Sequence, residues 1–176
     1  AILTGVAHDR GEAKVTVGDN EVRRCVQTFE LCAEEAKRLN GEMVPMQAAD
    51  GVKNRVGFTM RSARGVVCVI TPFNSPLNVV VHKVGPALAG GNAVVIKPSE
   101  YTPLTAVELC RILIDAGLPP TLLALVHGDG AVVGPQLLGD PGIAFYAFTG
   151  STRVGREIQR AAGLRRTQLE LGSIAS

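Results

Sequence analysis

The fold is decided by residues 65–100, which read GVVCVITPFNSPLNVVVHKVGPALAGGNAVVIKPSE. Short apolar runs rich in β-branched residues alternate here with a segment of helical length, and the same alternation continues toward residue 162. Continuous runs of this kind are typical of strands that are buried on both faces of a parallel sheet. The runs are Val66 to Ile70, Ala93 to Ile96, Leu122 to Val126 and Ile143 to Phe148.

Segments with helical spacing, each near a Gly or Pro boundary, precede and separate these runs. The regular alternation of strand and helix predicts an α/β fold with a doubly wound, mostly parallel, Rossmann-like sheet. Residues 43–64 are polar with patchy alternation, and we expect extended strands or a hairpin there. The predicted helices are Asp19 to Leu39, Leu77 to Leu88, Thr102 to Ala116, Ala131 to Leu138 and Thr152 to Ala162.

Size and charge limit the classes of protein that this chain fits. Its 176 residues are enough for one domain with a sizeable core. A net charge of +2 supplies no electrostatic footprint for nucleic acid or an anionic membrane, so we expect neither as a partner. No apolar run approaches the ~20 residues that span a bilayer, and the four cysteines show neither CxxC spacing nor a His cluster. We therefore expect a cytoplasmic protein with reduced thiols and no metal site.

In such a sheet, ligands bind beyond the carboxyl ends of the strands, so the turns that follow the apolar runs are where chemistry is expected. The first of these turns contains Asn74 between Pro72 and Pro76. Prolines fix the backbone, which suits a side-chain amide that must point at a developing negative charge. An asparagine that bonds its own backbone in a turn is an equally open interpretation.

The second turn is Lys97-Pro98-Ser99-Glu100. A cation beside a carboxylate at a strand end suits the two hydroxyls of a ribose, because the carboxylate accepts hydrogen bonds and the ammonium donates them. Two solvated charges in an exposed loop remain the alternative.

The third turn is Gly128-Asp129-Gly130, with Gly134 four residues later. It is similar to a dinucleotide-binding fingerprint, but the spacing is GxGxxxG and Phe148 stands where an acidic residue is expected. The glycines are equally consistent with close packing of a strand against a helix.

The fourth turn joins a strand to a helix through Thr149, Gly150 and Ser151. Ser151 or Thr152 can cap the helix, and the exposed amides of the first turn can receive a phosphate.

The last candidate is Glu170, a single carboxylate between Leu169 and Leu171. Apolar surroundings would raise the pKa of this carboxyl by desolvation, which suits a general base that works near neutral pH. An alternating strand with Glu170 facing water is the competing interpretation.

Taken together and in order, these segments resemble the aldehyde dehydrogenase family. The resemblance is specific from about Gly65 to the end and weaker from Ala1 to Arg64. It implies that residues 1–176 are the NAD(P)-binding domain of that fold, truncated at both ends, with residues 43–64 reaching toward an oligomerisation region. The pieces that carry it are Ile70-Thr71-Pro72-Phe73-Asn74, Gly90-Gly91-Asn92, Lys97-Pro98-Ser99-Glu100, Ala116-Gly117-Leu118-Pro119-Pro120, Phe148-Thr149-Gly150-Ser151-Thr152 and Leu169-Glu170-Leu171-Gly172.

The resemblance also implies roles for individual residues. Asn74 would help form the oxyanion hole, and Glu170 would activate the water that releases the product. Lys97 and Glu100 would hold the adenosine ribose, and Ser151 would meet the pyrophosphate. The full set of implied cofactor-binding residues is Ile70, Thr71, Pro72, Phe73, Lys97, Ser99, Glu100, Gly130, Gly134, Phe148, Thr149, Gly150, Ser151, Leu171 and Gly172.

The implied reaction is the oxidation of a small aldehyde to a carboxylic acid. A cysteine thiolate attacks the aldehyde, hydride passes to NAD or NADP, and water cleaves the thioester. That cysteine lies beyond the segment of Glu170 in the family, so this chain alone is expected to be inactive. Glu100 favours NAD, because a carboxylate near the ribose 2′ position would repel a phosphate.

The resemblance extends weakly to substrate and assembly. Residues 72–78 and the pair His82-Lys83 are similar to those of members that act on small polar aldehydes, such as lactaldehyde or phosphorylated and phosphonate aldehydes. Members are usually dimers or tetramers, so a homo-oligomer is expected.

Two other functions stay open. A non-catalytic nucleotide-binding or assembly module could retain the sheet without its chemistry, and in a CoA-acylating relative CoA would replace water in the second stage. A cysteine in the expected motif further along the protein would favour an enzyme, and Glu170 favours hydrolysis.

Overall fold

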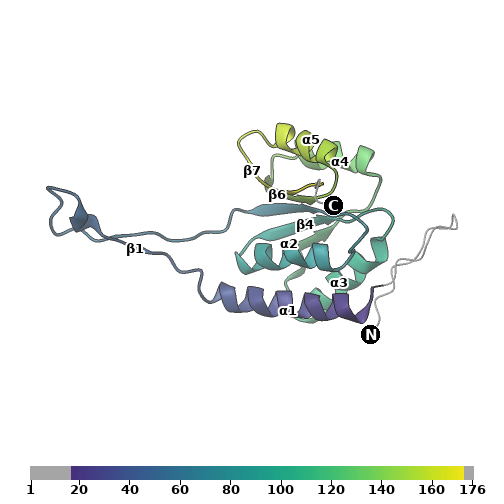
Figure 1. Cartoon of the computed structure of the whole chain (residues 1–176), viewed down its shortest axis with the longest axis horizontal. Helices are drawn as coiled ribbons and strands as arrows, with labels where there is room; N and C mark the ends of the chain where they lie inside the picture. The colour runs from purple at the N-terminus through teal and green to yellow at the C-terminus, as the bar shows by residue number, and fades with distance from the viewer. Residues whose placement is uncertain (1–16, 173–176) are drawn as a thin grey trace.

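The computed structural model describes residues 17–172. Its centre is a five-stranded sheet in which every neighbouring pair of strands is parallel, in the order β5-β4-β3-β6-β7 (Figure 1). The predicted α/β class with a doubly wound, parallel, Rossmann-like sheet is confirmed. The strands are β3 (Val66–Ile70), β4 (Ala93–Lys97), β5 (Leu123–Leu125), β6 (Ile143–Thr149) and β7 (Arg166–Glu170).

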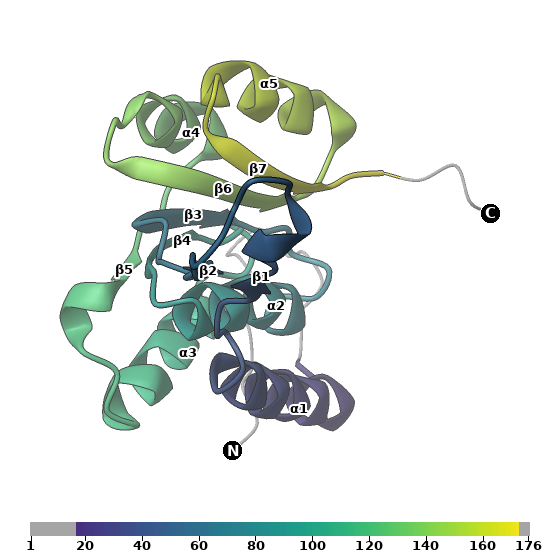
Figure 2. The same cartoon turned by 90° about the vertical axis from the view of Figure 1, so that its left-hand side faces the viewer.

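Helices cover both faces of the sheet. On one face lie α2 (Asn78–Ala89) and α3 (Pro103–Asp115), and α1 (Asp19–Ala36) packs against the outer side of α2 (Figures 1 and 2). On the other face lie α4 (Gly130–Gly139) and α5 (Thr152–Ala162). Each face therefore has its own helical layer, as the alternation of strand and helix predicted.

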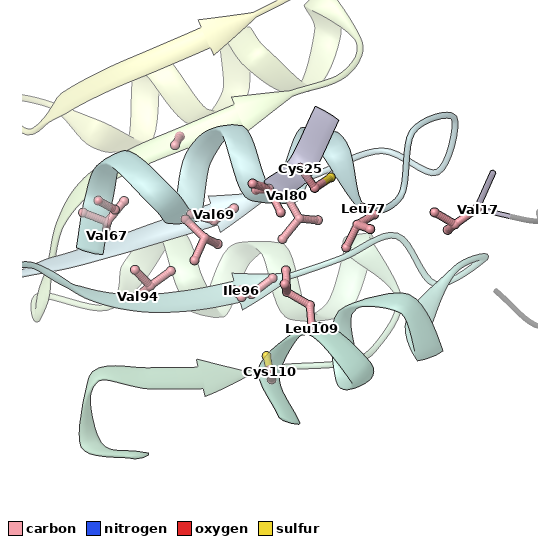
Figure 3. Packing of buried hydrophobic residues seen from close by; sticks show 14 residues of the cluster. Val17, Cys25, Val67, Val69, Leu77, Val80, Val94, Ile96, Leu109 and Cys110 are labelled. Atoms are coloured by element: carbon pink, nitrogen blue, oxygen red, sulfur yellow. The ribbon is translucent and has the colours of Figure 1, made fainter. Parts of the chain in front are cut away.

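The larger core lies between the sheet and α2. Alternate residues of β3 divide between the two faces, so Val67 and Val69 join the α2 side while Cys68 joins the α4 and α5 side. Val69 and Ile96 are fully buried in this cluster (Figure 3). Burial of each such side chain contributes about 1.5–3 kcal/mol, so aliphatic residues suffice where aromatic ones are sparse.

The two edge strands differ from the central ones. β5 is only half-buried, so the expectation that residues 122–126 would be buried on both faces is wrong. It is also shorter than expected, because the turn of 3-10 helix Pro120–Leu122 takes up the preceding residues. Along β7, exposed and half-buried residues alternate, because α5 covers only one face of that strand.

Residues 43–64 extend away from the central sheet (Figure 1). Strands β1 (Met43–Val44) and β2 (Gly57–Phe58) pair antiparallel around the short 3-10 helix Met46–Ala48, and the hairpin projects away from the sheet in Figure 1. A hairpin was predicted here, but its strands are only two residues each. Within residues 17–172, no helix is long and apolar enough to cross a membrane.

Candidate functional site

The carboxyl ends of the central strands meet at one edge of the sheet. Ile70 at the end of β3 pairs with Lys97 at the end of β4 and with Phe148 of β6. One residue further, Thr149 pairs with Glu170 at the end of β7. The turns singled out from the sequence therefore start at the same level and lie side by side.

A cavity of about 550 Å³ opens at this edge on the side of α4 and α5. Its walls combine strand ends with the helices of that face, so it lies where a doubly wound sheet places its ligand. The polar and glycine residues of the lining are Lys97, Glu100, Asp129, Gly130, Gly134, Arg153 and Glu157.

Lys97 and Glu100 form the main polar feature of this cavity. The Lys97 side chain is 6% exposed, and its Nζ donates to Glu100 Oε2 at 3.1 Å, while Glu100 is 43% exposed. The interpretation as two solvated charges is therefore wrong for Lys97. Its ammonium retains two further N–H donors, and the carboxylate retains acceptor positions, so the pair can both donate to and accept from a vicinal diol.

The helix that borders the cavity from β6 begins at a neutral cap. The Ser151 hydroxyl accepts a hydrogen bond from the Val154 N–H at 3.3 Å, which confirms the predicted capping of α5. A neutral cap leaves the positive end of the helix dipole available to an anion.

The helix that follows Gly128 begins differently. The Asp129 carboxylate accepts from the Ala131 N–H at 2.7 Å, so a negative charge already occupies the N-terminus of α4. This carboxylate disfavours a phosphate there, in agreement with the poor match of residues 128–134 to a phosphate-binding loop.

A second cavity, of about 300 Å³, opens on the opposite face of the sheet. Helices α1 and α2 form one wall, and the ends of β6 and β7 form the other. The lining residues are Arg24, Asn78, Val79, His82, Lys83, Thr149, Gln168 and Glu170.

Lys83 and Glu170 are the opposed charges of this second cavity. Lys83 is only 5% exposed, and burial lowers the pKa of its ammonium, against which the nearby Glu170 carboxylate acts in the opposite direction. Glu170 itself is exposed, so the expectation that its apolar neighbours would bury it is wrong. The reason is the edge position of β7, where Gln168 and Glu170 point to the face that α5 does not cover.

Asn74 lies in the exposed turn between β3 and α2. Among residues 17–172 its amide makes no hydrogen bond, so the interpretation as a self-bonded turn residue is not supported. The far end of the turn is held by Glu21 of α1, whose Oε1 accepts from the N–H groups of Leu77 and Asn78 at 3.0 and 2.8 Å. The turn thus offers a free amide on an anchored backbone.

The comparison with known proteins decides the family. The model described as "Aldehyde dehydrogenase family" matches residues 6–176. The chain belongs to the aldehyde dehydrogenase family. It is 50% identical to the 3-sulfolactaldehyde dehydrogenase of Priestia megaterium over 153 residues, which are 87% of this chain and 32% of that protein. It is 46% identical to aspartate-semialdehyde dehydrogenase 1 of Pseudomonas canavaninivorans, covering 89% of this chain and 33% of that one.

Solved structures of aldehyde dehydrogenases and their relatives have the same fold. The NADP-dependent glyceraldehyde-3-phosphate dehydrogenase of Bacillus halodurans, solved with NADP, superposes with a TM-score of 0.84 at 37% identity, covering 88% of this chain and 33% of that one. PnpE in complex with nicotinamide adenine dinucleotide gives 0.81 at 36% identity, covering 88% and 31%. The chain spans about a third of the length of the curated relatives that it matches.

The predicted cofactor residues of this chain fall into two groups. Ile70, Lys97, Glu100, Gly130 and Gly134 line the larger cavity, and Thr149 lines the smaller one. The others line neither cavity, and their roles stay predictions. They are Thr71, Pro72, Phe73, Ser99, Phe148, Gly150, Ser151, Leu171 and Gly172.

Some of the predicted cofactor residues that line neither cavity also have structural roles. Phe148 is buried in the core beneath α4 and α5, and the Ser99 hydroxyl accepts from the Tyr101 N–H at 3.3 Å. A Cβ added to Gly155 would lie 2.4 Å from Leu171 Cδ2. The glycine therefore allows α5 to pack against the residue that follows β7.

The sequence left several contributors to the site unassigned. From the sequence, Lys83 is a candidate only through the resemblance in substrate. Its valine neighbours in residues 79–84 are a further signal, because a lysine is rarely buried on the apolar face of a helix. Glu21 and Arg24 carried no local signal, because α1 reaches the site only through its packing on α2.

None of the four cysteines of this chain suits a nucleophile. Cys25, Cys68 and Cys110 are buried and Cys32 is half-buried. Burial raises the pKa of the Cys25 and Cys68 thiols to about 12, and it also raises the pKa of Cys32 and Cys110. A thiol whose pKa is raised in this way stays protonated and unreactive near neutral pH. Within residues 17–172 there is also no cluster of side chains suited to a metal ion.

Proposed function

We propose that the complete protein oxidises a small aldehyde to a carboxylic acid with NAD(P), through a cysteine thioester. The observation that carries this proposal is the pair of cavities on opposite faces of the same sheet edge. One lies at the ends of β3 and β4 and contains Lys97 and Glu100, and the other lies at the ends of β6 and β7 and contains Lys83 and Glu170. A dinucleotide in the first cavity can reach across this edge to a substrate in the second. The net reaction converts aldehyde, NAD(P)⁺ and water into carboxylic acid, NAD(P)H and one proton, and the acid then loses a second proton at neutral pH.

The larger cavity suits the adenosine half of the cofactor. Its volume of about 550 Å³ is typical of small-molecule sites, and its walls combine apolar side chains with the buried Lys97 ammonium and its partner, the Glu100 carboxylate. We assign the ribose hydroxyls to Lys97 and Glu100, and the pyrophosphate to the N-terminus of α5 at Ser151. When bound, the nicotinamide supplies the hydride acceptor.

Glu100 leads us to propose NAD as the preferred cofactor. A carboxylate that accepts from a 2′-hydroxyl would stand close to the 2′-phosphate of NADP and repel it. Structural relatives in complex with NADP and with NAD are both known, so the family itself does not decide this preference.

Two residues at the strand ends would act on the reacting carbon. The Asn74 amide can donate a hydrogen bond to the oxygen that becomes negative when a thiolate adds to the aldehyde. The exposed Glu170 carboxylate can take a proton from the water that cleaves the thioester. We place the attacking thiolate in a part of the protein other than these 176 residues.

Assembly and location follow as further parts of the proposal. The hairpin of β1 and β2 exposes Met43, Phe58 and Met60, which favours contact with another subunit in a homo-oligomer. Free thiols favour a reducing compartment, for which we propose the cytoplasm.

The cofactor assignment is tested in the full-length protein with a Lys97→Ala, Glu100→Ala double variant. We expect the Kd for NAD, measured by calorimetry, to rise by about tenfold or more, because two charged hydrogen-bonding groups are lost. The matched control is Lys37→Ala with Glu34→Ala, which removes an exposed pair of the same types and spacing on α1. Equal affinity in both double variants would contradict the assignment.

The reaction itself is tested by following reduction of the nicotinamide with small aldehydes. Turnover without added thiols supports hydrolysis by water. Turnover that requires CoA would show that CoA, in place of water, cleaves the thioester. Binding of NAD without any turnover would indicate a nucleotide-binding module.

A further inference from the structure

The cavity beside Glu170 is more basic than that single carboxylate requires. Its lining contains Arg24, His82 and Lys83, while Glu170 is its one acidic residue. The chain as a whole carries a formal charge of only +2, so this concentration of basic groups is local. The proposed reaction of an aldehyde explains Glu170 but gives no task to Arg24 or His82.

Lys83 shows that the cavity is a built site for a polar ligand. The side chain is 5% exposed and lines the cavity, yet its ammonium makes no hydrogen bond within residues 17–172. A buried ammonium without acceptors is costly, so the cavity must supply water or a ligand with oxygen atoms.

Arg24 presents a permanent positive charge at the cavity from α1. Glu21, one helical turn earlier, would be its natural partner, but that carboxylate accepts from the backbone of α2 instead. In the described part of the chain, the Arg24 guanidinium therefore has no ion pair, and all five of its N–H donors are available.

His82 is oriented toward the same region by a contact between the two helices. The Thr28 hydroxyl donates to the Arg24 carbonyl oxygen at 3.0 Å, and Thr28 Oγ1 lies 3.5 Å from His82 Nε2. This contact connects the imidazole of α2 with the turn of α1 that carries Arg24.

We propose that the aldehyde oxidised at this site carries an anionic group, a carboxylate or sulfonate, which Arg24 and His82 hold at the end of the cavity away from Glu170. Charge decides this orientation, because the Glu170 carboxylate repels an anion and the Arg24 guanidinium attracts it. The cavity of about 300 Å³ limits the substrate to a few carbon atoms between the aldehyde and the anion. This inference deepens the proposed function and rests on it.

The test compares two four-carbon aldehydes in the full-length protein, succinate semialdehyde and uncharged butyraldehyde. We expect wild type to favour the anionic aldehyde in kcat/KM, and Arg24→Gln to reduce that preference about fivefold to tenfold through KM. Arg23→Gln is the matched control, since Arg23 is an exposed arginine of the same helix that does not line the cavity. The kcat/KM for butyraldehyde should be the same in wild type and Arg23→Gln.

A binding measurement without cofactor separates this inference from the proposed function. By ligand-observed NMR, butyrate should bind more tightly than butyramide, its uncharged counterpart, and Arg24→Gln should remove the difference. Oxidation of both aldehydes with equal kcat/KM, or equal effects of Arg24→Gln and Arg23→Gln, would overturn the anion site and leave the oxidation standing. Arg24-dependent butyrate binding without oxidation of any aldehyde would support the anion site and overturn the proposed function.

Discussion

The contact between Glu21 and the start of α2 predicts a local loss of stability when the carboxylate is removed. Two backbone N–H groups donate to Glu21 Oε1, from Leu77 at 3.0 Å and from Asn78 at 2.8 Å. This carboxylate caps the N-terminus of α2, because the side chain of Leu77, the residue at the N-cap position, makes no capping hydrogen bond. Because the acceptor is charged and lies at the positive end of the helix dipole, we expect Glu21→Ala to cost about 2 kcal/mol of local stability and Glu21→Gln about 1 kcal/mol.

Hydrogen exchange in the full-length protein measures this loss where it arises. The amides of Val79 and Val81 donate within the first turn of α2, so their exchange reports its opening. We expect exchange about 30-fold faster in Glu21→Ala and about fivefold faster in Glu21→Gln. Glu30→Ala is the control, since Glu30 is exposed on α1 and its carboxylate forms no hydrogen bond with another described residue. Equal exchange of the two amides in Glu21→Ala and Glu30→Ala would refute the reasoning.

Two further predictions concern the core. The Arg165 guanidinium donates to five backbone carbonyls, the shortest bond being 2.8 Å to Ala161, and it lies 4.9 Å from the centre of the Tyr146 ring. We expect Arg165→Met to lower the free energy of unfolding by about 3 kcal/mol, measured as an earlier urea transition, while exposed Arg160→Met changes it by less than about 0.5 kcal/mol. The raised pKa of about 12 for the Cys68 thiol leaves about one molecule in ten thousand ionised at pH 8, so iodoacetamide should label Cys68 only after unfolding. Rapid labelling of native Cys68 would contradict its burial.

Much of the fold follows from local patterns. The apolar run Val66 to Ile70 became β3 with the same bounds, and Thr152 to Ala162 became α5 with the same bounds. The first is a continuous apolar run and the second has helical spacing, and both have clear flanking signals. β5 was less predictable, because the choice between a 3-10 turn and a strand after Pro120 depends on pairing with β4.

The candidate site was predictable where it lies on turns after strands. Lys97 and Glu100 are three residues apart, so their pairing is a local property. Arg24 and Glu21 were not predictable, since they act on residues more than fifty positions away through the packing of α1 on α2. The exposure of Glu170 depends on which face of β7 is covered, and its apolar neighbours in sequence give no information about that.

The central claim, that Glu170 is the base of the hydrolytic stage, is tested most directly by the Glu170→Gln variant of the full-length protein. Single-turnover kinetics should show a burst of reduced nicotinamide of about one equivalent per active site, because hydride transfer precedes hydrolysis. Steady-state turnover should then fall by about 10²–10⁴-fold, the contribution typical of a positioned acid or base. Steady-state turnover equal to that of the wild type would contradict the account.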